Sequence, residues 1–275
     1  MRQITMEIEA CGQSAQMVVN LLGDCVATDS ARRRPLTVIC PGGGYGFTSE
    51  REAHPIATQL NAMGIHTAIL YYSTAPAAQF PTALAQLATA VATARANAAD
   101  WDVAPDAISI MGFSAGGHLA GSLSVLWNQP VLRDALPRLT ADQVRPNRAI
   151  LCYPVISPYE YRHEGSFKNL LGSRYSDPEW LKQVALDQHV SADTPPTFLW
   201  HTAEDTLVPP QNSMLYASAL LQHQVPCELH LYPKGCHGIS LATPDTTPAE
   251  QPDMVIPSCQ NWIHMAGRFL LMDLA

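Results

Sequence analysis

The feature that most constrains the fold is a steady alternation of short apolar runs with segments of helical period. Runs typical of strands are expected at residues 4–9, 17–22, 36–40, 66–71, 107–111, 149–153, 197–201 and 228–232. The first two alternate in polarity and lie close together, which predicts an antiparallel opening. From residue 36 onward the runs are continuously apolar, as in strands covered on both faces. This pattern predicts an α/β fold with a mostly parallel central sheet.

Between the runs, apolar residues recur at the spacing of one helix face, and helices are therefore expected on both faces of the sheet. The residues that carry this spacing are Ile56, Leu60 and Met63; Leu84, Leu87 and Val91; Leu119, Leu123 and Leu126; Leu215, Leu220 and Leu221; and Trp262, Ala266, Phe269 and Leu270.

One stretch, residues 157–196, breaks this rhythm. It is polar, aromatic and irregular, with short helices expected only near 167–171 and 179–184. A connection of this length is unusual in an α/β unit, and long loops after strand ends often shape ligand clefts. We therefore expect a single domain, residues 1–275, with a small cap inserted at 157–196. A surface excursion without a role is the alternative.

Composition excludes several classes of partner. The chain has 16 Lys and Arg against 24 Asp and Glu, a formal charge of −8, which disfavours nucleic acid and anionic membranes. No run has the length or apolarity of a membrane span, and the N-terminus does not resemble a signal peptide. Seven widely spaced cysteines argue against a disulfide framework, so a cytoplasmic protein is expected. The cysteines are Cys11, Cys25, Cys40, Cys152, Cys227, Cys236 and Cys259.

The motif Gly112-Phe113-Ser114-Ala115-Gly116 directly follows the apolar run at 107–111 and precedes a helical segment. This is G-x-S-x-G in the strand–turn–helix setting that a nucleophilic serine requires. Glycines on both sides allow the sharp turn that exposes the Ser114 hydroxyl. The same turn directs the Ala115 N–H, at a helix N-terminus, toward developing negative charge.

An acid and a histidine are expected after later strands, in the order Ser, Asp, His. Asp205 follows the run at 197–201, with Glu204 as a rival that the residues alone do not exclude and an N-cap role as the alternative. His237 lies in a loop between small residues after the last run, and we assign it as the base. His201 and His230 fall within strands and are expected to be packed, whereas His118 is placed to line the pocket.

A glycine loop, Pro41-Gly42-Gly43-Gly44-Tyr45, follows the run at 36–40, where a second oxyanion donor is expected. A phosphate-binding loop is the competing interpretation, but neither G-x-G-x-x-G nor a following lysine is present. Histidines and carboxylates do not cluster at ligand spacing, so no metal site is expected.

With these residues placed, the chain resembles the α/β-hydrolase superfamily over nearly its whole length. It is most similar to the acetyl-xylan and feruloyl esterase-like branch, which is related to hormone-sensitive-lipase-type esterases. The most specific stretches are 41–45, 112–118, 165–172, 195–205 and 232–238. The resemblance implies an α/β-hydrolase fold and an oxyanion hole formed by Gly43, Gly44 and Ala115. It also favours Asp205 over Glu204.

The expected function is that of a serine carboxylesterase acting on short-chain, acetyl-type esters, including those of acylated carbohydrates, with Ser114, Asp205 and His237 as catalytic triad. Tyr45 and His118 are expected to bind substrate, and no cofactor is needed. An aminoacyl peptidase or an arylformamidase would use the same triad, and a non-catalytic binding protein would keep only the fold. The expected binding partner is a small-molecule ester substrate, and the sequence does not decide whether the chain forms a homo-oligomer.

Overall fold

The computed structural model describes residues 1–23 and 32–272, in which eight strands form one sheet of order β1-β2-β4-β3-β5-β6-β7-β8. β2 is antiparallel to both its neighbours, and the strands from β4 to β8 are parallel. All the expected strands are present, with ends that differ by a few residues. They are β1 (Arg2–Ala10), β2 (Gln13–Leu21), β3 (Arg34–Cys40), β4 (His66–Tyr71), β5 (Val103–Phe113), β6 (Ala149–Cys152), β7 (Thr197–Thr202) and β8 (Cys227–Tyr232).

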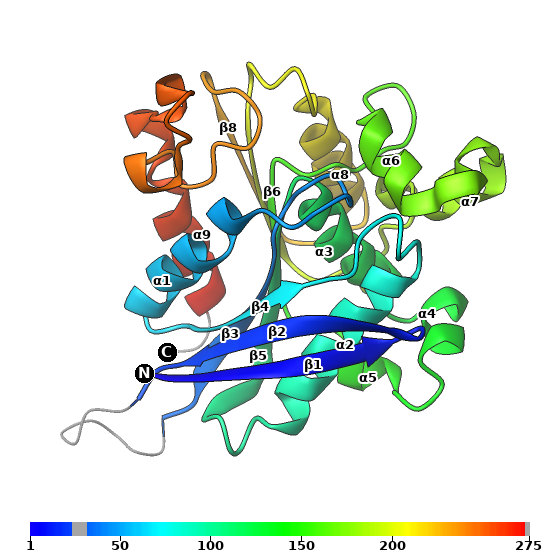
Figure 1. Cartoon of the computed structure of the whole chain (residues 1–275), viewed down its shortest axis with the longest axis vertical. Helices are drawn as coiled ribbons and strands as arrows, with labels where there is room; N and C mark the ends of the chain where they lie inside the picture. The colour runs from blue at the N-terminus through cyan, green and yellow to red at the C-terminus, as the bar shows by residue number, and fades with distance from the viewer. Residues whose placement is uncertain (24–31, 273–275) are drawn as a thin grey trace.

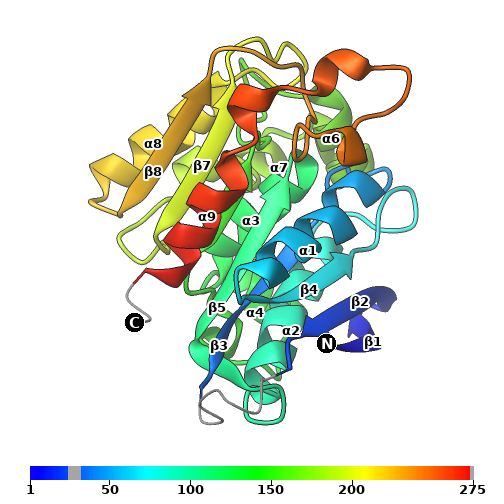
Figure 2. The same cartoon turned by 90° about the vertical axis from the view of Figure 1, so that its left-hand side faces the viewer.

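Helices cover both faces of this sheet (Figures 1 and 2). α1 (His54–Ala62) and α9 (Trp262–Leu271) pack on one face; α2 (Thr82–Ala96), α3 (Ala115–Leu126) and α8 (Gln211–Gln222) pack on the other. Neighbouring strand residues such as Ile110 and Met111 are both fully buried but belong to opposite clusters. Each buried side chain of this size contributes about 1.5–3 kcal/mol. The continuously apolar strands therefore serve two cores.

The helix α8 differs from the expectation in which of its residues are buried. Leu220 packs in the core, but Leu215 and Leu221 are exposed, and Tyr216 takes the buried position instead. The first turn also buries Asn212, whose Oδ1 accepts the Ile156 and Ser157 N–H groups at 2.9 and 3.1 Å. The buried face of α8 is therefore set by these hydrogen bonds to the chain after β6 rather than by a row of leucines.

The segment 157–196 folds into short helices beside the carboxyl end of the sheet (Figure 1). These are α6 (Glu164–Leu171), η2 (Gly172–Ser176), α7 (Pro178–Gln183) and η3 (Leu186–Gln188), so helices occur near both expected positions. Phe167 and Leu171 of α6 are buried against the main core. The segment therefore packs on the domain rather than extending from it.

Several shorter elements complete the described chain, and α4 and α5 were not expected from the sequence. They are η1 (Glu50–Glu52), α4 (Pro130–Ala135), α5 (Ala141–Val144), η4 (Pro244–Thr246), η5 (Pro252–Met254) and η6 (Pro257–Cys259). The described cysteines are free, and Cys25 lies outside the described residues. Over residues 1–23 and 32–272, no helix combines the length and apolarity needed to cross a bilayer, and no group of His, Cys, Asp and Glu is arranged for a metal ion.

Candidate active site

Ser114 occupies a strained turn between β5 and α3. Its φ of 54° and ψ of −116° lie in a region that side-chain-bearing residues seldom adopt. The flanking glycines make the turn possible: a Cβ on Gly112 would lie 1.9 Å from the carbonyl oxygen of Gly116, and one on Gly116 would lie 2.2 Å from that of Cys40. The motif therefore has a steric basis in this chain, and the turn brings the Ser114 side chain to the surface of a cavity.

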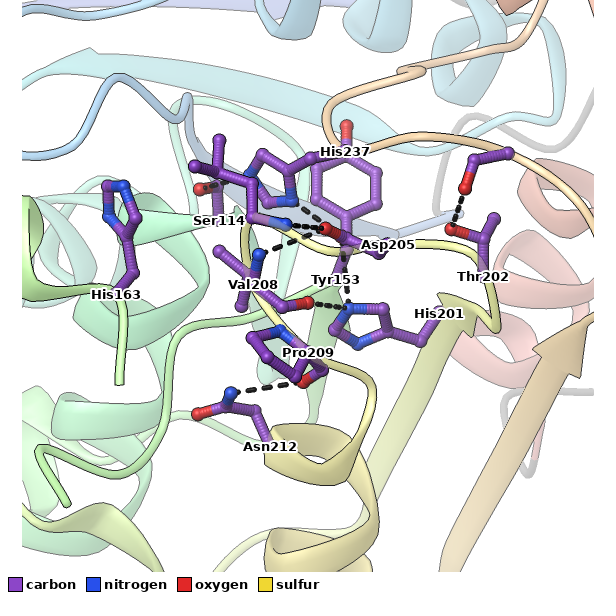
Figure 3. A network of polar contacts seen from close by, with 12 residues as sticks. Ser114, Tyr153, His163, His201, Thr202, Asp205, Val208, Pro209, Asn212 and His237 are labelled. Atoms are coloured by element: carbon purple, nitrogen blue, oxygen red, sulfur yellow. Dashed lines mark hydrogen bonds and ion pairs between the residues drawn. The ribbon is translucent and has the colours of Figure 1, made fainter. Parts of the chain in front are cut away.

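His237 and Asp205 converge on this serine from loops after β8 and β7 (Figure 3). Nε2 of His237 lies 2.7 Å from Oγ of Ser114, and Nδ1 lies 2.6 Å from Oδ2 of Asp205. With the ring proton on Nδ1 facing Asp205, Nε2 can accept the serine proton. The parallel strands end at one edge of the sheet, which is why three residues far apart in sequence meet there.

Asp205 has more hydrogen-bond donors than its histidine partner alone. The Leu207 and Val208 N–H groups donate to Oδ1 at 3.1 and 2.9 Å, and His201 Nε2 lies 3.2 Å from Oδ2. Burial raises the pKa of Asp205, but the hydrogen bonds from His201 and His237 outweigh it and hold that pKa well below its usual range. The carboxylate is therefore ionised beside the imidazole.

Glu204, the rival acid in the sequence, points elsewhere. It is exposed, and its Oε2 accepts the Gly235 N–H at 3.1 Å. The imidazole of His237 therefore contacts Asp205 and not Glu204.

His201 is buried within β7, as expected, but it also contacts the acid. Its Nε2 lies 2.8 Å from the carbonyl oxygen of Val208 as well as near Asp205, and its Nδ1 lies 2.8 Å from Ser213 Oγ. A carbonyl oxygen only accepts, so Nε2 carries the proton and donates toward Asp205. A buried histidine four residues before an acid at a strand end was the signal that could have suggested this contact.

The glycine loop after β3 lines the same cavity through Gly43 and Gly44, whose φ values are positive. The Gly43 carbonyl accepts the Gly46 and Phe47 N–H groups, which closes the turn. Ala115 is the first residue of α3, so its N–H has no acceptor within the helix. Gly43 and Gly44 therefore share the cavity wall with Ser114, and Ala115 directly follows Ser114 at the start of α3.

Tyr45 and His118, expected to contact substrate, are not on the cavity surface. Both are buried, Tyr45 Oη lies 2.9 Å from His118 Nδ1, and His118 Nε2 lies 3.0 Å from the carbonyl oxygen of Val184. Burial lowers the pKa of His118 to about 4, so the ring is neutral at neutral pH. One turn after Ser114, the His118 side chain faces the core and joins the glycine loop to the inserted segment.

The cavity above Ser114 has a volume of about 420 Å³, and the inserted segment forms part of its wall. Asn169 donates to the Gly44 carbonyl at 2.9 Å, and His163 Nδ1 accepts the Ser166 N–H at 3.3 Å as the N-cap of α6. Neither side chain was expected at the cavity from the sequence. The lining residues are Gly43, Gly44, Phe47, Ser49, Arg51, Glu52, Ser114, His163, Gly165, Asn169, Leu207, His237 and Gly238.

A serine in a strained turn after a parallel strand, with an acid and a histidine after later strands, defines the chain as an α/β hydrolase. The sequence profile of the family described as BD-FAE matches residues 25–220. The chain belongs to this family.

Curated relatives and solved structures agree with this assignment. The chain is 35% identical over 213 residues to endo-1,4-beta-xylanase B of Butyrivibrio fibrisolvens and 31% identical over 247 residues to the acetylxylan esterase of Xylanibacter ruminicola. These matches cover 76% and 88% of the chain but only 33% and 47% of those proteins. The chain thus spans less than half the length of either relative.

Two solved structures are similar over most of the chain. The carboxylesterase Cest-2923 of Lactobacillus plantarum has a TM-score of 0.86 at 30% identity, with 98% of this chain and 97% of that chain covered. The acetyl ester-xyloside bifunctional hydrolase of Caldicellulosiruptor lactoaceticus has a TM-score of 0.76 at 35% identity, with 94% and 87% covered.

Proposed function

We propose that the chain is a serine esterase that hydrolyses short-chain, acetyl-type carboxylic esters of carbohydrates through an acyl-enzyme on Ser114. The observation that carries the proposal is the unbroken contact from Ser114 Oγ through His237 to Asp205, at 2.7 and 2.6 Å. The names of the relatives, which include an acetylxylan esterase and a carboxylesterase, support the ester class.

In the proposed mechanism His237 removes the Ser114 proton as Oγ attacks the ester carbonyl, and Asp205 stabilises the imidazolium that forms. The N–H groups of Gly43, Gly44 and Ala115 bind the oxyanion; losing one such donor typically costs about 10²–10³ in kcat. The proton on His237 then passes to the leaving alcohol. Water, activated by the same nitrogen, hydrolyses the acyl-enzyme.

The walls of the cavity support a short acyl group and a polar alcohol. The large apolar side chains at the cavity are Phe47 and Leu207, and they are 63% and 54% exposed, so they do not enclose a long acyl chain. Arg51, His163 and Asn169 supply polar atoms that suit a hydroxylated alcohol such as a sugar. In this proposal residues 157–196 act as a cap, because they contribute His163 and Asn169 to the wall.

The test combines active-site labelling with substrate profiling. A fluorophosphonate probe is expected to label Ser114, and Ser114→Ala is expected to lose labelling and to lower kcat/KM for p-nitrophenyl acetate by about 10⁵–10⁶-fold. The exposed Ser258→Ala variant is the matched control and is expected to keep both. An unlabelled wild-type protein would instead favour a binding protein with this fold.

Substrate panels then test the class of ester. Acetylated xylo-oligosaccharides and p-nitrophenyl acetate are expected to be hydrolysed much faster than p-nitrophenyl esters of long acyl chains. Aminoacyl amides and N-formyl aromatic amines are included as competing classes. A preference for either of them, or activity that persists at long chain length, would contradict the proposed substrate class.

A further inference from the structure

Glu52 is a buried carboxyl group beside the active site that the proposed mechanism does not use. It ends η1, just before α1, and is 3% exposed. Its Oε2 accepts the Gly42 N–H at 2.7 Å, and its Oε1 accepts the Tyr153 hydroxyl at 2.6 Å. Burial of a carboxylate is costly unless its oxygens are hydrogen-bonded, and both oxygens of Glu52 have a donor.

One of these bonds holds the glycine loop where it approaches the nucleophile. Gly42 directly precedes Gly43, and its carbonyl accepts the Ser49 N–H at 2.9 Å. A Cβ on Gly42 would lie 2.7 Å from Glu52 Oε2 and 3.1 Å from the Cβ of Ser114. The Glu52 carboxylate therefore fixes the backbone next to the proposed oxyanion donors.

The other hydrogen bond, from the Tyr153 hydroxyl to Glu52, links Glu52 to His237. The Tyr153 ring packs edge-on against His237, with ring centroids 5.2 Å apart and an interplanar angle of 73°. The Tyr153 hydroxyl, which donates to Glu52, also accepts the Ser240 N–H at 3.1 Å. Tyr153 is 1% exposed, so the packing around it holds the side chain in the rotamer that makes these contacts.

The neighbouring residue Arg51 also binds the segment that follows His237. Its Nη1 donates to the carbonyl oxygens of Gly238 and Thr246 at 3.1 and 3.0 Å, and its own carbonyl accepts the Ser240 hydroxyl at 2.6 Å. Residues 51–52 thus contact both the glycine loop that contains Gly42 and the segment that follows His237.

We propose that Glu52 is a positioning residue that couples the oxyanion loop to His237 through Gly42 and Tyr153. The inference rests on the proposed function, because it assigns Glu52 a part in the same reaction. Glu52 touches no reacting atom in this proposal; it holds the Gly43 N–H and the His237 ring in one fixed geometry relative to Ser114. Errors of about 1 Å in such geometry can lower a rate about 100-fold.

The test uses Glu52→Gln and Tyr153→Phe, singly and together. Glutamine keeps the shape of the side chain but has one acceptor oxygen, so it cannot accept from both Gly42 and Tyr153. We expect kcat for p-nitrophenyl acetate to fall about 10- to 100-fold in Glu52→Gln, with KM changed less than about threefold. Tyr153→Phe keeps the ring on His237 and is expected to lose less, and the double variant is expected to lose less than the product of the two single effects.

The matched control is a second glutamate and tyrosine pair, whose glutamate, Glu50, lies on the same turn as Glu52. Glu50 is exposed and accepts the Tyr71 hydroxyl at 3.2 Å, so Glu50→Gln and Tyr71→Phe remove similar groups away from the cavity. Both are expected to keep kcat within about twofold of the wild type, on the scale of ordinary surface substitutions.

Affinity for an alkylboronic acid, which forms a tetrahedral adduct with a nucleophilic serine, separates positioning from a general loss of stability. It is expected to weaken in Glu52→Gln by about the factor lost in kcat. Wild-type kcat and boronate affinity in Glu52→Gln, or additive effects in the double variant, would overturn the inference. If Glu52→Gln does not fold, Tyr153→Phe with unchanged kcat overturns it equally. Retained activity in Ser114→Ala would overturn the proposed function instead.

Discussion

Asp205 and Glu52 are two buried carboxyl groups near His237, the first in direct contact with it and the second linked to it through Tyr153, and they are stabilised in different ways. Asp205 accepts hydrogen bonds from two backbone N–H groups and lies within reach of two histidine rings, whereas Glu52 accepts one N–H and one hydroxyl. Burial raises the pKa of both. At Asp205 the hydrogen bonds from His201 and His237 reverse that effect, while at Glu52 the bonds from Tyr153 and Gly42 only reduce it.

The comparison shows that burial alone does not decide the ionisation of a carboxyl group. It also depends on the hydrogen bonds and charges that face the group, and these lower the pKa more at Asp205 than at Glu52. Asp205 is suited to stabilise an imidazolium because its lowered pKa keeps the carboxylate ionised before the reaction begins. Glu52 is suited to hold neutral groups in place.

The largest effect in this comparison is expected for Asp205→Asn. The amide can no longer accept the His237 Nδ1–H through an ionised oxygen, so the tautomer and charge of the ring are disturbed, and kcat is expected to fall about 10³–10⁴-fold. Glu204→Gln is the matched control and is expected to retain activity within a few-fold. Steady-state kinetics on p-nitrophenyl acetate measures both, and the reverse order of effects would assign the acid to Glu204.

A smaller effect is expected for His201→Phe. An aromatic ring is retained, although a larger one, and the Nε2–H directed at Asp205 is lost. A hydrogen bond to a charged group contributes about 1.5–3 kcal/mol, so kcat is expected to fall about 10- to 100-fold. His230→Phe, on the neighbouring strand β8, removes a histidine that contacts Glu228 and Phe198 instead. Equal losses in the two variants would show that His201 acts only through packing.

The smallest expected effect is on the pH dependence of folding stability, and its sign differs between the two carboxyl groups. The folded-state pKa of Asp205 is lowered, so its contribution is complete above the unfolded value of about 3.9 and is lost as pH falls through the folded pKa. The folded-state pKa of Glu52 is raised, so its contribution is complete below about 4.3 and decreases as pH rises through the folded pKa.

Urea unfolding of the wild type, Asp205→Asn and Glu52→Gln between pH 3 and pH 7 tests these signs. The stability deficit of Asp205→Asn is expected to shrink below about pH 4, whereas that of Glu52→Gln is expected to shrink as pH rises from about 4. Deficits that move in the same direction would contradict the difference between the two sites.

The local sequence predicted structure well where all the residues that a feature requires lie in one short segment. The turn at Ser114 needs Gly112 and Gly116 for steric reasons, and both glycines are visible in the motif. The continuously apolar strands likewise predicted a sheet covered on both faces, because alternate residues must be buried against different helices.

Side-chain direction was harder to predict. His118 follows Ser114 closely, yet its position on α3 turns it into the core, where it contacts Tyr45 and Val184. Glu52 lies in a polar stretch that is typical of a solvent-exposed turn, and nothing near it in the sequence indicates Gly42 or Tyr153 as partners. Leu215 and Leu221 fit a helical period but face solvent.

The sequence by itself determined the succession of strands and long helices along the chain and the identity of Ser114, Asp205 and His237 as candidates, because these depend on periodicity, turn sterics and position after strands. Only the tertiary structure decided that Asp205 rather than Glu204 contacts His237, that His201 donates toward Asp205, and that Glu52 contacts the glycine loop and Tyr153. Those contacts join residues up to about a hundred positions apart, and their energies depend on burial and donor geometry that arise only when the sheet edge is assembled.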